Sequence, residues 1–506
     1  MHILQSNMRY IFISAFILFS GLQLQAQQAT FQWSEISSNT NTGLQNSQLV
    51  FPTPDGFTVY SVENLGTQVY APQAVYITRF NSEGEKGETI DFPLPKRKLA
   101  HATLLKVIEG ASKLYVFSYI ALKKDKKNTL YVQVYDNKLG TVLESKEIYT
   151  IAFEKLSASG FFKVGISEDK KTIGLLVNKP FVKKTKEQIE VLILDPDLNI
   201  RSNSSQSLSF DNDRAPREEL FVENDATISI VKKTNIFKKE PITSVITIKG
   251  EKLTEKQVSA EKFYISDNKI VTINGKQYLL GFATDNAKPS VSMGGAKDKS
   301  FFIYSISEEK LIKNQGWNPE VLKKILGKGF IDLKVKDVLL HNEEIYLIGD
   351  CMSKSSKEIE GENFEYDYTY NFGPGVVVKL NTSGEVAYDT YVKYGERYKN
   401  NMNRLGAFKP VIRNNDVYLL GNEKLSILQE KNIVLGYESI NAKAIVARKL
   451  LSDGSFSIVA FESGIVGGKG NVVDFAPTRT LQLDDTTFYV YAYGKKYHAF
   501  GKMVIN

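Results

Sequence analysis

The stretch Asn342-Glu-Glu-Ile-Tyr-Leu-Ile-Gly349 has two close copies in the chain, Asn274-Gly-Lys-Gln-Tyr-Leu-Leu-Gly281 and Asn414-Asn-Asp-Val-Tyr-Leu-Leu-Gly421. Each copy begins with a polar turn and continues with Tyr, two aliphatic residues and Gly. Looser copies surround Tyr115 and Tyr489. A Tyr at one fixed offset predicts a repeated strand, in which Tyr346 and its counterparts supply aromatic bulk between stacked units. The Gly of each copy is then expected where neighbouring units approach one another.

A second element, a β-hairpin, alternates with the Tyr-containing strands. Clear copies begin at Val75, Leu130, Val376 and Ala444, and each has an apolar strand, a turn of Asn, Asp or Gly, and a second, alternating strand. These turn residues tolerate the left-handed backbone that a tight reversal requires. Together the two elements predict units of four antiparallel strands at intervals of roughly 50–75 residues.

This pattern resembles the β-propeller architecture over nearly all of residues 27–506, without the signature of a characterised propeller family. The resemblance implies an all-β fold in which blades stack around an axis. The predicted blades are 46–92, 102–150, 160–210, 218–260, 268–317, 335–394 and 407–462. Residues 478–505 lack a fourth strand, which we expect the N-terminal segment around Phe31 and Trp33 to supply, for eight blades closed into a ring. Seven blades follow if 218–260 is irregular, and two β-sandwich domains are the alternative fold.

The N-terminus is typical of a secretory signal peptide. Arg9 precedes an apolar run from Ile11 to Phe19, and Ala26 is a suitable residue before the cleavage point. About ten apolar residues are too few to span a bilayer of roughly 30 Å, so a membrane anchor is the less favoured interpretation. We therefore predict a signal peptide at 1–26 and a single domain at 27–506, exported to the periplasm, cell surface or exterior of a Gram-negative bacterium. The single cysteine, Cys351, excludes an intramolecular disulfide.

Charge and motifs indicate neither a nucleic-acid partner nor a cofactor. The net charge is +7, but 53 of the 64 basic residues are Lys, which favours a solvated surface over phosphate recognition. His101, His341 and His498 lie in no zinc-binding motif, and Asp195-Pro-Asp197-Leu-Asn199 lacks the later ligands of a calcium loop. No catalytic or metal-binding residues are predicted.

The candidate binding residues lie where the repeat is interrupted. The insertion Met352–Pro374 alternates acids with Phe364, Tyr366, Tyr368 and Tyr370, and an extended segment would place these rings on one face. Such a face suits a sugar ring or a peptide. Alternatively, the hairpin folds over its own blade and buries the rings. Arg397 and Tyr398, in the next aromatic segment, complete the predicted site.

The function predicted from these features is a non-catalytic binding or scaffold protein, monomeric, that recognises a protein or glycan partner through its blade loops. The alternative is a secreted carbohydrate-active enzyme that uses Glu362, Glu365 and Asp367 in a cleft. That alternative requires two facing carboxylates about 5–10 Å apart.

Overall fold

The fold is known from a computed structural model of the chain. The residues that it describes are 29–34, 37–38, 48–53, 56–62, 74–97, 100–214, 216–234, 241–259, 263–285, 299–326, 333–358, 366–393, 396–399, 406, 408–429, 443–461, 474–493 and 497–505. The predicted signal peptide lies outside these ranges. Within them, no helix has the length and apolar character needed to cross a membrane.

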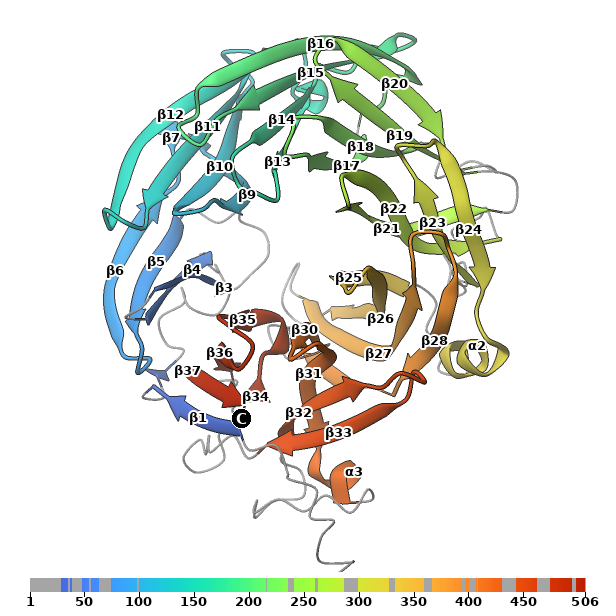
Figure 1. Cartoon of the computed structure of the whole chain (residues 1–506). Coiled ribbons are helices and arrows are strands. Elements are labelled where there is room, and N and C mark those ends of the chain that lie inside the picture. The colour runs from blue at the N-terminus through green and yellow to red at the C-terminus, as the bar shows by residue number, and fades with distance from the viewer. Residues whose placement is uncertain are drawn as a thin grey trace, which may run out of the picture.

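The described strands form eight sheets of four or more strands, arranged as the blades of a ring (Figure 1). The chain is an eight-bladed β-propeller. The first four blades are blade 1, β3 (Gln48–Thr53), β4 (Gly56–Val62), β5 (Ala74–Asn81) and β6 (Lys86–Pro93); blade 2, β9 (Thr103–Glu109), β10 (Lys113–Leu122), β11 (Lys127–Asp136) and β12 (Thr141–Ala152); blade 3, β13 (Phe161–Ile166), β14 (Ile173–Asn178), β15 (Lys186–Leu194) and β16 (Ile200–Asp211); and blade 4, β17 (Arg217–Val222), β18 (Ile228–Thr234), β19 (Ile242–Lys249) and β20 (Lys252–Gln257).

The next three blades follow the same strand order. They are blade 5, β21 (Tyr264–Ile273), β22 (Lys276–Thr284), β23 (Ser300–Ser305) and β24 (Lys310–Gly316); blade 6, β25 (Leu333–His341), β26 (Glu344–Glu358), β27 (Tyr366–Leu380) and β28 (Val386–Val392), with β29 (Glu396–Lys399) added to β27; and blade 7, β30 (Lys409–Arg413), β31 (Asp416–Lys424), β32 (Lys443–Leu450) and β33 (Phe456–Phe461). In each blade the first strand faces the centre of the ring and the fourth lies at the rim (Figure 1). Strands β17 to β20 thus form a regular blade in the segment expected to be the weakest unit, so eight blades are confirmed and the two-sandwich alternative is wrong.

Blade 8 joins the two ends of the chain. Its order is β34 (Asp474–Phe475), β36 (Thr487–Tyr493), β37 (Tyr497–Ile505) and β1 (Ala29–Trp33), so the N-terminal strand is the outermost one. Short strands β2 (Ser37–Ser38) and β35 (Leu481–Gln482) pair with β37 and β36. The antiparallel register runs from Ala29 opposite Ile505 to Trp33 opposite Gly501. The predicted closure by the N-terminal strand is confirmed.

One apolar cluster fills each of the eight interfaces between successive blades. Tyr278, Tyr346 and Tyr418 are buried in the clusters between blades 5 and 6, 6 and 7, and 7 and 8. Because neighbouring blades cover both faces of a sheet, interior strands such as β14 are buried at every position, whereas the outer strand β16 is exposed at most positions. The repeated Tyr is therefore a packing residue, as predicted.

The repeated Gly serves two different purposes. A Cβ on Gly349 would lie 2.5 Å from the Phe282 ring of blade 5, so this Gly admits a neighbouring blade as predicted. A Cβ on Gly281 would instead lie 2.0 Å from the Asp267 carbonyl oxygen, in the first strand of its own blade. That strand has an irregular register between Ile265 and Asp267, which brings its backbone closer to Gly281.

Tight turns on one side of the ring join the first strand of a blade to its second. Asn274 and Gly275, Asn342 and Glu343, and Asn414 and Asn415 all have positive φ at consecutive positions, as type I′ turns require. The other side carries the segments between second and third strands and the links from one blade to the next. We call this side the loop face.

Among the described residues, two short α-helices and a small hairpin lie outside the blades. Helix α2 (Pro319–Leu326) follows Asn318, whose side-chain oxygen accepts a hydrogen bond from the Glu320 amide at 3.0 Å. Asn318 thus caps the N-terminus of this helix. Helix α3 (Leu425–Gln429) follows β31, and strands β7 (Lys96–Arg97) and β8 (Ala100–His101) pair in the link from blade 1 to blade 2.

Candidate functional site

The largest interruption of the repeat is a hairpin on the loop face of blade 6. Strands β26 and β27 have 15 residues each, and their pairing continues from Met352 opposite Phe372 to Glu358 opposite Tyr366. Strand β29 pairs with β27 along this extension, between Thr369 and Phe372. The extension is therefore three-stranded near its base, which holds it more firmly than a two-stranded hairpin.

The predicted binding residues fall on these strands. Tyr366, Tyr368 and Tyr370 occupy alternate positions of β27, so the backbone is extended as the prediction assumed. Tyr398 pairs with Tyr370 and Arg397 with Asn371, which brings β29 beside the aromatic segment. Phe364 lies outside the described residues. The use of these residues for binding stays a prediction.

The base of the hairpin packs against blades 8 and 1, where the two ends of the chain meet. Phe372 is buried, and it belongs to the apolar cluster of blades 8 and 1 that includes Ala476 and Tyr491. Tyr370 is half-buried and packs against the same cluster. These contacts fix the direction in which the extension leaves the ring, although its aromatic pattern alone did not reveal them.

The central channel contains a cavity of about 780 Å³ lined by first strands of blades 2 to 7. Lys269, which lines the cavity, places its Nζ 2.6 Å from Asp337 of blade 6. Beside the cavity, the Val335 amide donates to Asp267 of blade 5 at 2.7 Å. Lys336 lies 4.0 Å from Asp350; burial lowers the pKa of this Lys and raises the pKa of this Asp. The contacts of Lys269 and Val335 connect blades 5 and 6, whereas Lys336 and Asp350 lie on adjacent strands of blade 6. Packing of the ring explains them.

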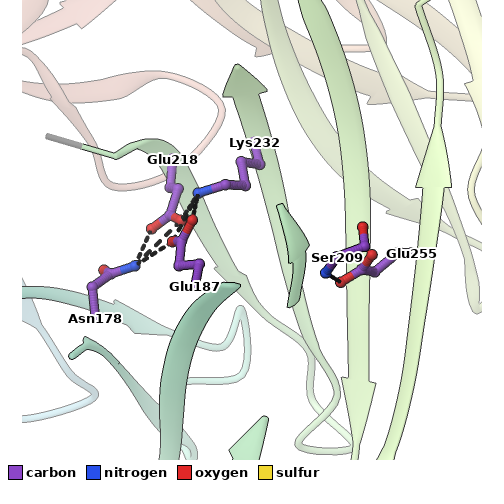
Figure 2. A network of polar contacts seen from close by, with 6 residues as sticks. All are labelled: Asn178, Glu187, Ser209, Glu218, Lys232 and Glu255. Carbon is purple, nitrogen blue, oxygen red and sulfur yellow. Dashed lines mark hydrogen bonds and ion pairs between the residues drawn. The ribbon is translucent and has the colours of Figure 1, made fainter. Parts of the chain in front are cut away.

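A buried ionic cluster joins blades 3 and 4 (Figure 2). Lys232 Nζ, on β18, donates to Glu187 at 2.9 Å and to Glu218 at 2.6 Å, and the three side chains are 1–3% exposed. The Asn178 amide donates to both carboxylates at 3.1 Å. Beside the cluster, the Ser209 amide donates to Glu255 at 2.9 Å and connects the outer strands of the same two blades.

The sequence predicted none of this cluster. A usable signal was present, since Glu187 stands in a strand, β15, whose other residues are mostly apolar. Glu218 faces Lys232 on the neighbouring strand of blade 4, 14 positions earlier in the sequence. Glu187 stands 45 positions before Lys232 in blade 3, so the complete cluster forms only when the blades stack. Because its carboxylates are closed to solvent, they are not available to a sugar substrate.

Glu187 gives the cluster a pH dependence. Burial raises the pKa of its carboxyl to about 7, with Glu218 adding to the rise and Lys232 opposing it. A carboxyl whose pKa is higher in the folded chain than in the unfolded one favours folding at low pH, and this contribution is lost as pH rises from the unfolded pKa to about 7.

We expect the stability of the wild-type chain to fall, relative to Glu187→Gln, by on the order of 3 kcal/mol between pH 5 and pH 8. Gln at 187 retains a donor and an acceptor but does not titrate. Urea unfolding of both chains across this range measures the difference. The control is Glu190→Gln in the same strand. Burial acts to raise the pKa of Glu190, but hydrogen bonds from Lys179, Tyr149 and Asn203 outweigh it and lower that pKa. The stability difference between the wild type and Glu190→Gln should therefore stay constant over this pH range. A constant difference for Glu187 would contradict the assignment.

A metal site and a reactive histidine each need a particular arrangement of side chains. Among the described residues, no group of three or more His, Cys, Asp or Glu is placed to hold a metal ion. His341 contacts the Asn415 carbonyl and the Asn342 side chain at 3.0 Å each. His498 is buried and His101 is exposed.

No protein-family model matches the chain, and a search of curated proteins gave no match. Solved propeller structures are similar in shape. The WD40 domain of SCAP from fission yeast is 10% identical with a TM-score of 0.39, over 94% of this chain and 98% of that one. The β-propeller domain of the Trilobed protease from Pyrococcus furiosus is 13% identical with a TM-score of 0.36, over 84% of this chain and 98% of that one. At such identities we transfer no partner or activity from them.

Proposed function

We propose that this chain is an exported, monomeric, non-catalytic binding or scaffold protein that recognises a protein or glycan partner through its loop face. The observation that carries the proposal is the three-stranded extension of blade 6. A ring of eight blades provides a rigid support, and function commonly lies in segments that depart from such a support. Here the departure combines Tyr366, Tyr368 and Tyr370 with the neighbouring strand of Arg397 and Tyr398.

The composition of the extension suits recognition. Tyr has few rotatable bonds and combines an apolar ring with a polar hydroxyl, so it makes contacts at low entropic cost. The base is held by Phe372 and by β29, which lowers the entropy lost when a partner binds.

The enzyme alternative is less favoured. Of its three acids, Asp367 lies opposite Lys357 in the hairpin register, and Glu362 and Glu365 lie outside the described residues. The close pair of acids described above, Glu187 and Glu218, is buried and bound to Lys232. No specific observation on the described residues supports sugar hydrolysis.

A shortened hairpin tests the proposal. We expect replacement of residues 354–370 by Asn-Gly to leave folding intact and to abolish partner binding, since Ser353 and Asn371 face each other and a two-residue turn can join them. This variant keeps Phe372 in its cluster. Binding is measured by affinity capture from the native envelope and on a glycan array.

The matched control shortens another segment of the same face. The register of β22 and β23 ends with Ala283 opposite Ser300, and the side chains of Asp285 and Lys299 form an ion pair at 2.8 Å just beyond it. A short turn can therefore join the two strands, and residues 286–298 can be replaced by Asn-Gly. The control should retain binding. Equal binding by both variants would place the site elsewhere on the protein.

A further inference from the structure

A groove on the loop face separates blade 2 from blade 3. Its blade 2 wall contains residues 125–127 and the segment that follows β12, from Ala152 to Ala158. Its blade 3 wall contains residues 180–183, together with Arg214 from the link to blade 4. The cavity is about 660 Å³, a size that accommodates ligand groups in other proteins. Neither wall includes blade 6, so the groove is distinct from the aromatic hairpin.

The groove is strongly cationic. Five basic residues line it, namely Lys126, Lys127, Lys155, Lys183 and Arg214, against two acids. Both acids have a basic partner: Glu154 pairs with Lys126 at 2.6 Å and Asp125 with Arg97 at 3.8 Å. Within the described part of the chain, no carboxylate forms an ion pair with Lys127, Lys155 or Lys183, and all three side chains are exposed. Their charge is available to a ligand.

The floor of the groove is apolar. Phe153 is buried beneath it, Phe181 is half-buried, and Val182 is 54% exposed at its edge. Leu156, beside Lys155, is 46% exposed. Exposed aliphatic side chains among unpaired lysines indicate a ligand with both carboxylates and an apolar group.

The walls are held in place by the buried cluster of blades 3 and 4. Residues 180–183 belong to the segment between Asn178 and Glu187, and Arg214 precedes Glu218 by four positions. Asn178, Glu187 and Glu218 are all bound in that cluster. The blade 3 wall is therefore fixed at both ends before a ligand arrives, which reduces the ordering required on binding.

We propose that this groove binds an acidic peptide segment of a protein partner. Carboxylates of the peptide lie against Lys127, Lys155 and Lys183, and an aliphatic or aromatic side chain packs against Val182. A glycan fits less well, because the guanidinium of Arg214 lies 5.1 Å from the centre of the Phe181 ring and occupies the face on which a sugar would stack. The proposal extends beyond the hairpin and does not depend on it.

Selection from a random peptide library displayed on phage, with the mature chain as bait, tests the groove. The expected peptides combine Asp or Glu with a large apolar residue. Their synthetic forms should bind about tenfold or more weakly to the variant Lys127→Glu, Lys155→Glu, Lys183→Glu, since each reversal replaces attraction by repulsion. Affinity should also fall with rising salt.

The control variant is Lys252→Glu, Lys310→Glu, Lys424→Glu, which makes the same change in net charge at exposed positions outside the groove. It should bind the selected peptides as the wild type does, and so should the chain with the shortened hairpin. The proposal is overturned if no acidic peptide is enriched, if the groove variant binds them unchanged, or if both charge variants lose binding equally. Binding of heparin through the groove lysines in place of any peptide would overturn it in favour of an anionic glycan.

Discussion

Lys232→Met is expected to lower the free energy of unfolding by about 3–5 kcal/mol, because it leaves two buried carboxylates without their cation. Lys232 Nζ lies 2.6 Å from the nearest oxygen of Glu218 and 2.8 Å from the nearest oxygen of Glu187, and all three side chains are buried. Urea unfolding at neutral pH, with the m-value compared between chains, measures the loss. Met retains much of the apolar part of the Lys side chain, so the measured loss of stability reflects the missing charge more than lost packing.

The control for this prediction is Lys256→Met. Lys256 and Glu309 pair at 3.0 Å, but both side chains are about half exposed, so the pair should contribute about 0–1 kcal/mol. A second variant, Lys232→Met with Glu218→Gln, should recover part of the loss because it removes one of the unpaired charges. A loss below that of the control, or no recovery in the double variant, would contradict the ionic role of the cluster.

Deletion of residues 30–37 is expected to destabilise the whole ring. Strand β1 pairs with β37 along five residues, and the Phe31 and Trp33 rings stack at 5.8 Å over the cluster between blades 7 and 8. Losing two large apolar side chains should cost about 3–6 kcal/mol. The bare edge of β37 should also promote association between molecules. Thermal melting and size-exclusion chromatography measure the two effects.

A point variant separates loss of the strand from loss of chain length. A Cβ on Gly501 would lie 2.5 Å from the Trp33 ring and 2.8 Å from the Gln32 carbonyl, so Gly501→Val should displace β1 in the full-length chain and lower its stability in the same direction. Thr30→Ala, at an exposed position of β1, is the control and should change little. An unchanged melt after the deletion would show that closure by β1 does not stabilise the ring.

The closing strand and the buried cluster at Lys232 differ in how far the sequence predicts them. The closing strand could be predicted because residues 478–505 visibly lack a fourth strand and a strand-like segment around Phe31 lacks a blade. The cluster at Lys232 could not, because Glu187 stands 45 positions before Lys232 in another blade, and no local pattern says that these two side chains meet. The same applies to Phe372, whose partners lie in blades 8 and 1, far along the chain.

The sequence by itself determined the blades, through the repeat that begins at Asn342. Turns that need positive φ and strands that alternate with them are properties of a few consecutive residues, so Asn342, Glu343 and Tyr346 specify them locally. Tertiary structure alone decided which charged and aromatic side chains meet between blades, and whether Gly349 and Gly281 admit a neighbouring blade or their own backbone. The reason is that those contacts depend on the stacking of the ring, which joins residues that are tens to hundreds of positions apart.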